Sequence, residues 1–534
     1  MSARERYVKL SSDRSQFLDT ARRAAELTLP YLIRDEEDYN KSSKVLKTPW
    51  QSVGAKGVVT LASKLMLALL PPQTSFFKLQ VNDIGLGEEL GPQIRSELDL
   101  SFAKIERTVM ESIAASDDRV VVHQALKHLV VAGNALIFMG KEGLKLFPLN
   151  RYAVDRDGNG NVIEIVTKET ISKKLLKKFY PDYKEPVPNE VSAGGGLSAT
   201  YGGGPGNDEC EVFTHVKLDN NRWVWHQEVE DKILPGTMSK APKDANPWLV
   251  LRFNHVDGEV YGRGRVEEFI GDLKSLEALS QALVEGSAAA AKVVFTVSPS
   301  STTKPATLAK AGNGAIVQGR PDDIGVVQVG KTADFQTAFQ MAGTLSQRLS
   351  EAFLVLNVRQ SERTTAEEVR MTQLELEQQL GGLFSLLTVE FLVPYLNRKL
   401  SVAQKTGEIP RLPKGNIVKP TIVAGINAIG RGQDAQSLGQ FLQTVAQTMG
   451  PEAIGTFING EEVVKRLAAA QGIDVLNLVK SMQEVQAEQQ QAMQQQEQME
   501  MTKQAGQFAQ VDQKREEMYN GESDTPPPPT PQEG

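Results

Sequence analysis

The residues with the most recognisable chemical spacing are GVVQVGKT, 325–332, which match the phosphate-binding pattern G-x-x-x-x-G-K-[ST]. In such a loop, glycines and small residues let backbone N–H groups surround phosphates that the lysine also reaches. Here Val, Val, Gln and Val separate the glycines and favour a strand, and a turn, GRPDDI, precedes them. The pattern therefore favours a strand-to-helix junction, with a nucleotide site that uses Lys331 as the alternative.

A second motif, DRDGNG at residues 155–160, matches the first half of a calcium-binding loop. The twelfth position of such a loop needs a bidentate glutamate, and it is Val166 here. The flanking residues favour strands rather than the helices of a calcium-binding hand. The sequence therefore predicts a β-turn at these residues.

Histidine and cysteine are too sparse for a predicted catalytic or metal centre. Two of the five histidines, His123 and His128, are five residues apart and so do not share a helix face. Cys210 is the single cysteine, which excludes a disulfide within the chain and a multi-cysteine zinc site. The patterns G-x-S-x-G, H-E-x-x-H and C-x-x-C do not occur. We therefore expect no catalytic residue, no cofactor and no metal, with packing or surface roles for His123, His128, His215, His226 and His255.

Pairs of arginines lie in polar segments that precede long helical patterns. Arg359 and Arg363 stand in a segment with few apolar residues, and a capping box of Thr365 and Glu368 predicts that a helix begins directly after it. Two more arginines lie in YGRGR, 261–265, at the entry of another helix. Both segments are either solvated turns or contacts at an interface or pore, because arginines in loops also bind phosphates.

Length and composition fit a globular protein with several packed regions. The chain has 534 residues, a hydrophobic content of 40%, a charged content of 23% and a net charge of −7. The N-terminal residues are too polar for a signal peptide, and the apolar run at 58–72 is too short and too polar for a membrane span. We therefore expect an intracellular, soluble protein without a membrane partner.

The hydrophobic pattern predicts the elements that must position these residues. Residues 12–135 are predicted to be mostly helical, with a helix that runs into a strand near Ala135, and 144–256 to be rich in strands. Two long helices, over 261–294 and 332–356, enclose a strand-rich insert. A third long helix follows over about 366–400, with further helices past 430. The chain then becomes Gln-rich from 483 and ends Pro-rich, a composition that cannot bury a core.

Several segments, in the same order, resemble the portal proteins, or head–tail connectors, of T7-like tailed bacteriophages. The resemblance covers about residues 10–435 and is specific through its combination of segments. The segments are TPWQSVGAKGVVTLASKLMLALLPPQTSFFKL (48–79), VVAGNALIF (130–138), VDGEVYGRGRVEEFIGDLKSLE (256–277), GRPDDIGVVQV (319–329), SERTTAEEVR (361–370), LGGLFSLLTVEFLVP (380–394) and AGINAIGRGQD (424–434).

The resemblance implies a mainly α fold with α+β portions, arranged as the portal fold of wing, stem, clip and crown. Twelve copies would form a ring around a central DNA channel at one capsid vertex. The implied boundaries are wing 1–260, stem helices 261–292 and 332–356, clip 293–331, tunnel loop 357–365, wing helix region 366–430, crown helices 431–482 and tail 483–534. The tail is expected to form a barrel helix or to be disordered.

The resemblance also implies partners and site residues. The tunnel loop would present Arg359, Gln360 and Arg363 to double-stranded DNA. A channel wall that is acidic or neutral, with sparse basic rings, would let the DNA slide. Clip residues would dock the terminase large subunit and then the tail adaptor. For that role we single out Lys304, Lys310 and Arg320.

Further implied partners are the major capsid protein, the scaffolding protein and internal core proteins, in a virion assembled in the host cytoplasm. In the family a separate terminase hydrolyses ATP, so the chain itself is expected not to be an enzyme. The alternatives are a DNA translocase that binds nucleotide at 325–332 and a different virion ring, such as a tail adaptor.

Overall fold

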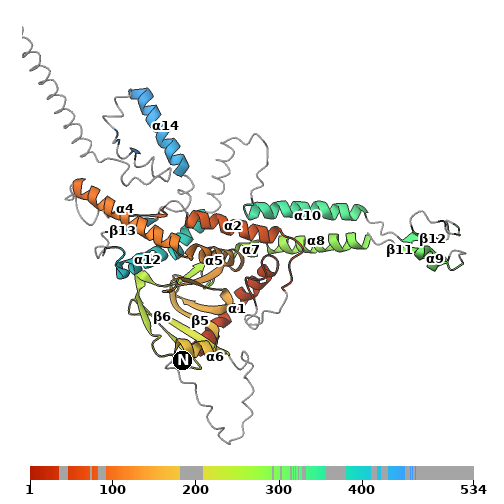
Figure 1. Cartoon of the computed structure of the whole chain (residues 1–534), viewed down its shortest axis with the longest axis horizontal. Helices are drawn as coiled ribbons and strands as arrows, with labels where there is room; N and C mark the ends of the chain where they lie inside the picture. Colours follow the sequence, from red (N-terminus) through yellow and green to blue (C-terminus); the bar gives the residue numbers. More distant parts are fainter. Residues whose placement is uncertain are drawn as a thin grey trace, which may run out of the picture. The chain divides into compact units, whose positions relative to one another are not determined.

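The computed structural model describes residues 1–34, 46–71, 75–81, 92–180, 209–290, 294–300, 304–312, 324–327, 332–355, 381–410, 418–422 and 431–450, with single positions from 316 to 322 and from 458 to 464. The chain divides into two units, Met1–Ala428 and Ile429–Gly534, which are described separately. In the described residues of the first unit, helices combine with antiparallel sheets (Figure 1). The expected mixture of α and β structure is therefore confirmed.

The N-terminal part is helical, as predicted, but its first helix starts earlier than the pattern at residue 12 indicated. Ser2 Oγ accepts a hydrogen bond from Glu5 N at 3.3 Å, and Glu5 Oε2 accepts one from Ser2 N at 3.1 Å. This capping box sets the start of the helix at Ala3. The helices are α1 (Ala3–Glu26), α2 (Val53–Leu69), α4 (Pro92–Ala115) and α5 (Asp118–Ala132).

The predicted change from helix to strand near Ala135 is confirmed. Gly133 ends α5 with a left-handed φ of 72°, and its N–H bonds to Leu129 O at 2.9 Å. The chain then enters β2 (Asn134–Met139), the central strand of a sheet with β3 (Leu144–Phe147) and β10 (Trp248–Arg252).

A larger sheet occupies the predicted strand-rich region. Its strands are β4 (Tyr152–Arg156), β5 (Val162–Ser172), β6 (Glu209–Asp219), β7 (Arg222–Val229), β8 (Lys232–Ile233) and β9 (Ser239–Pro242). Asn220 and Asn221 connect β6 to β7 with positive φ angles of 43° and 64°, which asparagine tolerates. The two strands thus form a hairpin within the predicted strand-rich region. A short helix, α6 (Lys173–Phe179), follows β5.

The helix predicted over 261–294 is divided into two pieces. Arg263 first forms an isolated bridge to Asn254, and α7 (Arg265–Glu268) precedes α8 (Ile270–Ala290). The break lies at Phe269, whose N–H bonds back to Val266 O at 3.2 Å instead of continuing the α-helical pattern. The second predicted helix is α10 (Thr332–Ala352).

Later segments return to the N-terminal part of this unit. The predicted third helix is described from residue 381 only, and it continues through a π-helical turn at Thr388–Leu392 (η6) into α12 (Val393–Thr406). Strand β13 (Val418–Ile422) then pairs with β1 (Phe77–Val81), so that Phe77 lies opposite Ile422.

One large apolar cluster joins these helices and the small sheet. Its most buried large side chains come from α2, β1 and the helix of residues 381–406, and include Leu61, Leu65, Phe77, Phe391 and Tyr395. Smaller clusters lie under α1 and under α6. In the second unit, the structure describes α14 (Arg431–Met449).

Candidate functional site: the long helix pair, its insert and its anchor

Helices α8 and α10 lie antiparallel and side by side (Figure 1). The contacts fix this direction: Asp272 near the start of α8 pairs with Arg348 near the end of α10 at 3.3 Å, and Gly286 near the end of α8 lies against the ring of Phe335. Each helix has 21 residues and is therefore about 30 Å long at 1.5 Å per residue. The segment between them consequently leaves and returns at the same end of the pair.

The segment between the helices, here called the insert (residues 291–331), contains a short antiparallel ladder. Strand β11 (Val294–Val297) pairs with β12 (Ile324–Val327), and Thr296 Oγ1 donates to Gly325 O at 3.1 Å. A short helix, α9 (Pro305–Lys310), lies between them. The strands of the predicted strand-rich insert are confirmed where the structure describes it. Helix α9 was not predicted, because six residues are too few for a helical period.

Cations from two other helices hold the C-terminal end of α10. Lys64 Nζ in α2 donates to Leu354 O at 2.6 Å, and Arg265 Nε and Nη2 donate to Ala352 O at 3.3 and 3.2 Å. Positive groups at this end also complement the helix dipole. Burial lowers the pKa of Lys64 below its usual value. Leu354 has a left-handed φ of 56°, and Val355 N bonds to Ser350 O at 2.7 Å, so the helix ends in a tight turn.

The arginines of YGRGR have carboxylate partners and are not simply solvated. Arg263 bonds to both oxygens of Glu259, at 2.9 and 2.6 Å, and to Glu267 at 2.5 Å. The hydrogen bond to Glu259, together with the charge of Glu267, raises the pKa of Arg263 above its usual value despite partial desolvation. A Cβ at Gly264 would lie 2.7 Å from Val131 O, so only glycine allows this close approach. These arginines fix the base of the helix pair.

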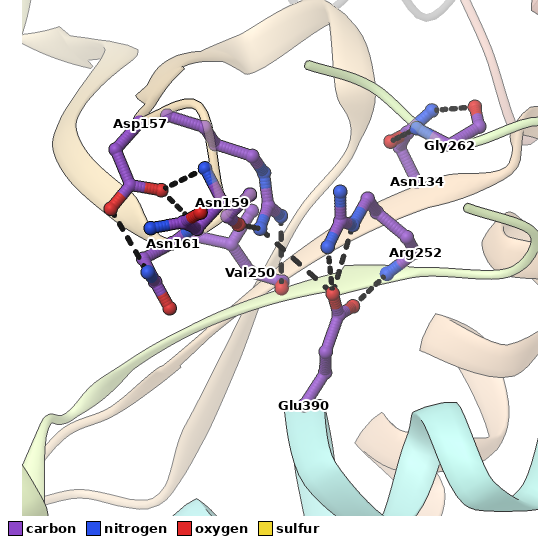
Figure 2. Close-up of polar contacts among 10 residues, drawn as sticks. Asn134, Asp157, Asn159, Asn161, Val250, Arg252, Gly262 and Glu390 are labelled. Atoms are coloured by element: carbon purple, nitrogen blue, oxygen red, sulfur yellow. Dashed lines mark hydrogen bonds and ion pairs between the residues drawn. The ribbon is translucent and has the colours of Figure 1, made fainter. Parts of the chain in front are cut away.

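A buried ion cluster connects the π-helical turn of residues 388–392 to the sheets (Figure 2). Glu390, on the π-helical turn, accepts hydrogen bonds from Arg252 N, Nε and Nη2 at 2.8, 2.8 and 2.6 Å. Arg156 Nη1 lies 3.8 Å from the same carboxylate, and burial followed by repulsion from Arg252 lowers the pKa of Arg156 to about 10. One carboxylate thus compensates two buried guanidinium groups that come from different strands.

An amide of β2 holds the start of the YGRGR segment. Asn134 Oδ1 accepts from Gly262 N at 2.7 Å, and Asn134 Nδ2 donates to Gly262 O at 2.6 Å, as Figure 2 shows. Asn134 is buried, so these bonds satisfy its polar groups. The base of the helix pair is therefore attached at two places, by Asn134 and by the cations at the end of α10, while the Arg263 ion pairs brace the YGRGR segment itself.

The proposed docking residues all lie in the insert and are exposed. Lys304 directly precedes α9, Lys310 is its last residue, and Arg320 lies between α9 and β12. In the described part of the chain, no recorded interaction connects the three side chains to one another. All three residues therefore lie in the insert, and among the described residues they do not line a common pocket.

The phosphate-binding pattern lies partly in a strand. Gly325 belongs to β12, where a Cβ would lie 2.7 Å from Thr296 Oγ1. The strand that we expected at the valines of this pattern is confirmed for residues 324–327. The helix that follows the pattern begins at Thr332. Lys331 lies outside the described residues. So do Arg359, Gln360 and Arg363, and the whole segment 356–380.

The predicted turn at 155–160 is confirmed. Asp157 Oδ1 accepts from Asn159 N at 3.0 Å and from Asn161 N at 2.7 Å, and Asp157 Oδ2 accepts from the Asn161 amide at 2.9 Å (Figure 2). These bonds, with the Asn161 side chain first, lower the pKa of Asp157. The carboxylate therefore holds backbone N–H groups, and the described residues contain no cluster of metal-ligating side chains.

The histidines take packing and pairing roles. His128 is buried, and His123 Nε2 lies 3.2 Å from Ser63 Oγ. His215 and His226 each contact a carboxylate of the large sheet, Glu164 at 2.6 Å and Glu228 at 2.8 Å.

Comparisons with known proteins assign the chain to a family. The family model described as "Bacteriophage head to tail connecting protein" matches residues 1–478. The chain belongs to this head-to-tail connecting protein family. Among curated proteins, it is 38% identical to the portal protein of Enterobacteria phage T3 and 37% identical to that of Escherichia phage T7, each over 91% of this chain and 89% of the relative. The resemblance to T7-like portal proteins is therefore confirmed.

Solved structures resemble the connector chain at a lower level. The neck of an empty gene transfer agent particle is 10% identical with a TM-score of 0.36, and the match covers 78% of this chain and 89% of that chain. Separately, among the described residues, no helix of the connector chain is long and apolar enough to cross a membrane.

The sequence analysis did not identify three residues that hold the elements of this unit together, namely Lys64, Arg252 and Glu390. Arg252 and Glu390 are 138 positions apart, so no local pattern connects them. The available signal was a lone glutamate inside the apolar run LLTVEFLVP, because a charge there needs a buried partner. Lys64 gave a similar signal, as the single charge within the apolar run 58–69 of α2.

Proposed function

We propose that the chain is one subunit of a dodecameric ring at one capsid vertex. The ring surrounds the channel through which DNA enters during packaging and leaves during ejection. It docks the terminase large subunit and later the tail, and it has no catalytic activity of its own. The proposal rests on the membership of the family and on one structural observation, the exposed apolar side chains of the helix pair.

Among the described residues, the large side chains of α8 and α10 that are buried lie at the base of the pair. Leu273, Leu276 and Leu349 are buried there, whereas the outer parts expose Val284 by 53%, Phe339 by 72% and Met341 by 55%. Large apolar side chains exposed on an extended helix pair are expected to lie in an interface. A second copy of this chain, packed beside the first, supplies that cover, and a closed ring repeats the contact in every subunit.

The parts of the ring follow from this arrangement. We assign the wing to 1–260 with 366–430, the stem to 261–292 and 332–356, the clip to 293–331 and the crown to 431–482. The antiparallel helix pair supports the stem assignment, and the start of the second unit at Ile429 supports the crown boundary. Residues 483–534 form the tail of the subunit.

The ring is tested by the substitution Phe339→Asp, which places a charge in the proposed interface. Burial of a phenylalanine contributes about 1.5–3 kcal/mol in each subunit, so the variant is expected to lose ring assembly while each subunit stays folded. Light scattering and negative-stain images measure assembly, and the neighbouring Gln340→Asp is the matched control. A wild-type protein without rings, or a Phe339→Asp variant with normal rings, would contradict the proposal.

We further assign docking of terminase and tail to the insert, with Lys304, Lys310 and Arg320 as contact residues. Their exposure on one projection supports this role. Deletion of 300–318 is expected to leave rings intact and to abolish binding of terminase and tail proteins. Rings of this variant that still package DNA and join tails would refute the assignment.

The channel contact is assigned to Arg359, Gln360 and Arg363, on the resemblance of their segment to the tunnel loop. Arginine contacts to phosphates would repeat in each subunit of the ring and act on DNA of any sequence. Replacing both arginines by alanine should leave ring formation unchanged and alter packaged length or DNA retention. Normal packaging and retention in this variant would remove the assignment.

A further inference from the structure

The short helix α6 carries an unusual concentration of charge for an acidic chain. Its sequence, KKLLKKF, places lysines at 173, 174, 177 and 178. At 100° per residue these four positions span an arc of about 140°, so they share one face. Leu176 lies on the other side, is 1% exposed and packs with Val212 and Val229 of the large sheet. The lysine face therefore turns away from the sheet.

Helix stability does not explain this pattern. Lys177 and Lys178 in the last turn complement the helix dipole, but Lys173 and Lys174 in the first turn oppose it. The preceding Ser172 makes no capping bond with its side chain, and the first turn contains no acidic residue. Pairs of like charge four residues apart also repel one another on a helix. A surface pattern that lowers local stability indicates a role in binding.

Neighbouring lysines of the same sheet are paired with carboxylates, whereas three of the four lysines of α6 are not paired among the described residues. Lys168 pairs with Glu211 at 3.0 Å, and Lys145 pairs with Glu169. Within the part of the chain that the structure describes, no ion pair is recorded for Lys173, Lys174 or Lys178. Of the four lysines, Lys173 is half-buried and the others are exposed.

We propose that the lysine face of α6 binds the phosphate backbone of double-stranded DNA, independently of base sequence. Side chains four residues apart on a helix are about 5–6 Å apart and can contact separate phosphates of one strand. The centre of a protein interface favours aromatic anchors and contains few lysines. Here the nearby Tyr180 turns inward, and its hydroxyl bonds to Gln227 at 2.5 Å.

This face is separate from the proposed channel elements. Figure 1 shows α6 at the end of the large sheet, far from α8, α10 and the insert. DNA bound here does not have to pass along the helix pair. Binding at α6 can therefore be measured with DNA that cannot thread through a ring.

The test uses the full-length protein and a relaxed, covalently closed circular duplex, which has no end to enter a channel. Binding is measured over a range of salt concentrations for the wild type and for a variant with all four lysines replaced by glutamine. The slope of log K against log salt is expected to fall by about 0.9 for each phosphate contact removed. The control changes four exposed lysines elsewhere in the same region to glutamine, namely Lys141, Lys232, Lys240 and Lys243.

Two smaller variants keep the test valid if the fourfold variant is unstable. One double variant combines Lys173→Gln with Lys174→Gln, and the other combines Lys177→Gln with Lys178→Gln. In each, the slope of log K against log salt is expected to fall by less than in the fourfold variant. Changing all four lysines to arginine is expected to retain binding. Equal slopes in the wild type and the glutamine variants, or an equal loss in the control, would overturn the proposal. So would polyglutamate that binds the lysine face more tightly than DNA, because the partner would then be an acidic protein.

Discussion

At the scale of single residues, buried charges decide how the first unit holds together. Glu390 is the shared acceptor for Arg252 and lies close to Arg156, and all three side chains are almost completely buried. The hydrogen bonds come from one backbone N–H and one guanidinium, so the carboxylate also fixes the position of β10. Removal of this single acceptor leaves two buried positive groups without compensation.

We therefore expect Glu390→Gln to lower the free energy of unfolding by about 3–5 kcal/mol, the usual effect of breaking a buried ion pair from one side. Urea unfolding followed by circular dichroism measures the loss. The matched control is Glu351→Gln, which changes an exposed carboxylate on α10 and is expected to stay within about 0.5 kcal/mol. Equal stability of the two variants would contradict the role of Glu390 as the shared acceptor.

His128 gives the unit a specific dependence on pH. Burial, followed by the charge of Lys127, lowers the pKa of His128 to about 4, from about 6.5. The folded state thus keeps the imidazole neutral while the unfolded chain takes up a proton below about pH 6.5. The free energy of unfolding therefore falls as pH drops from about 6.5 to about 4, by roughly 3 kcal/mol for this residue.

His128→Leu is expected to remove this contribution, so its stability should fall less than that of the wild type between about pH 7 and about pH 4.5. Urea unfolding at both pH values measures the difference. His255→Gln, which changes an exposed histidine, is the matched control. A wild-type slope retained in His128→Leu would show that His128 is not the titrating group.

At the scale of elements, close packing sets how the helix pair meets the body of the unit. Gly57 of α2 faces Phe353 at the end of α10, and a Cβ at Gly57 would lie 2.6 Å from Phe353 Cγ. Phe353 is completely buried, so its ring has no free space to move into. The glycine lets α2 approach close enough for Lys64 to reach the end of α10.

Gly57→Ala is accordingly expected to destabilise the unit by about 1–3 kcal/mol through overpacking, although alanine favours a helix by about 1 kcal/mol. Gly271→Ala, in α8, meets no atom within 4 Å and should leave stability unchanged or raise it. Thermal unfolding of the two variants provides the comparison. A stabilised Gly57→Ala variant would mean that α2 and α10 are not tightly packed.

Much of the element order could be predicted, because periodic patterns reflect burial on one side. Leu273 and Leu276 repeat at helical spacing, as do Leu349 and Phe353, and the structure buries all four at the base of the pair. The break at Phe269 could not be predicted, because it depends on contacts of the YGRGR segment with β2. The ion pairs of Glu390 with Arg252 and Arg156 could not be predicted either, because the partners are distant in sequence.

At the scale of the whole molecule, the chain divides into two units, Met1–Ala428 and Ile429–Gly534. We expect a chain that ends at Ala428 to retain the unfolding transition of the first unit, with a similar midpoint, because its core comes from residues before that point. Circular dichroism during thermal unfolding of both chains measures this. A truncated chain without a cooperative transition would show that the first unit needs the second in order to fold.

The net charge of −7 adds a second property at this scale. An acidic chain keeps non-specific association with DNA weak. Attraction is then confined to local basic features, such as the lysine face of α6.

The π-helical turn at Thr388–Leu392 changes the phase of a helix that otherwise runs without a break from 381 to 406. A turn of this kind contains one extra residue, so the residues after it are rotated by about 100° relative to a regular α-helix. Phe384 before the turn and Tyr395 after it are both buried, while Val389 within the turn is 69% exposed. A deletion of one residue here would shift every later side chain to another face, so this turn is intolerant of the length changes that surface loops accept.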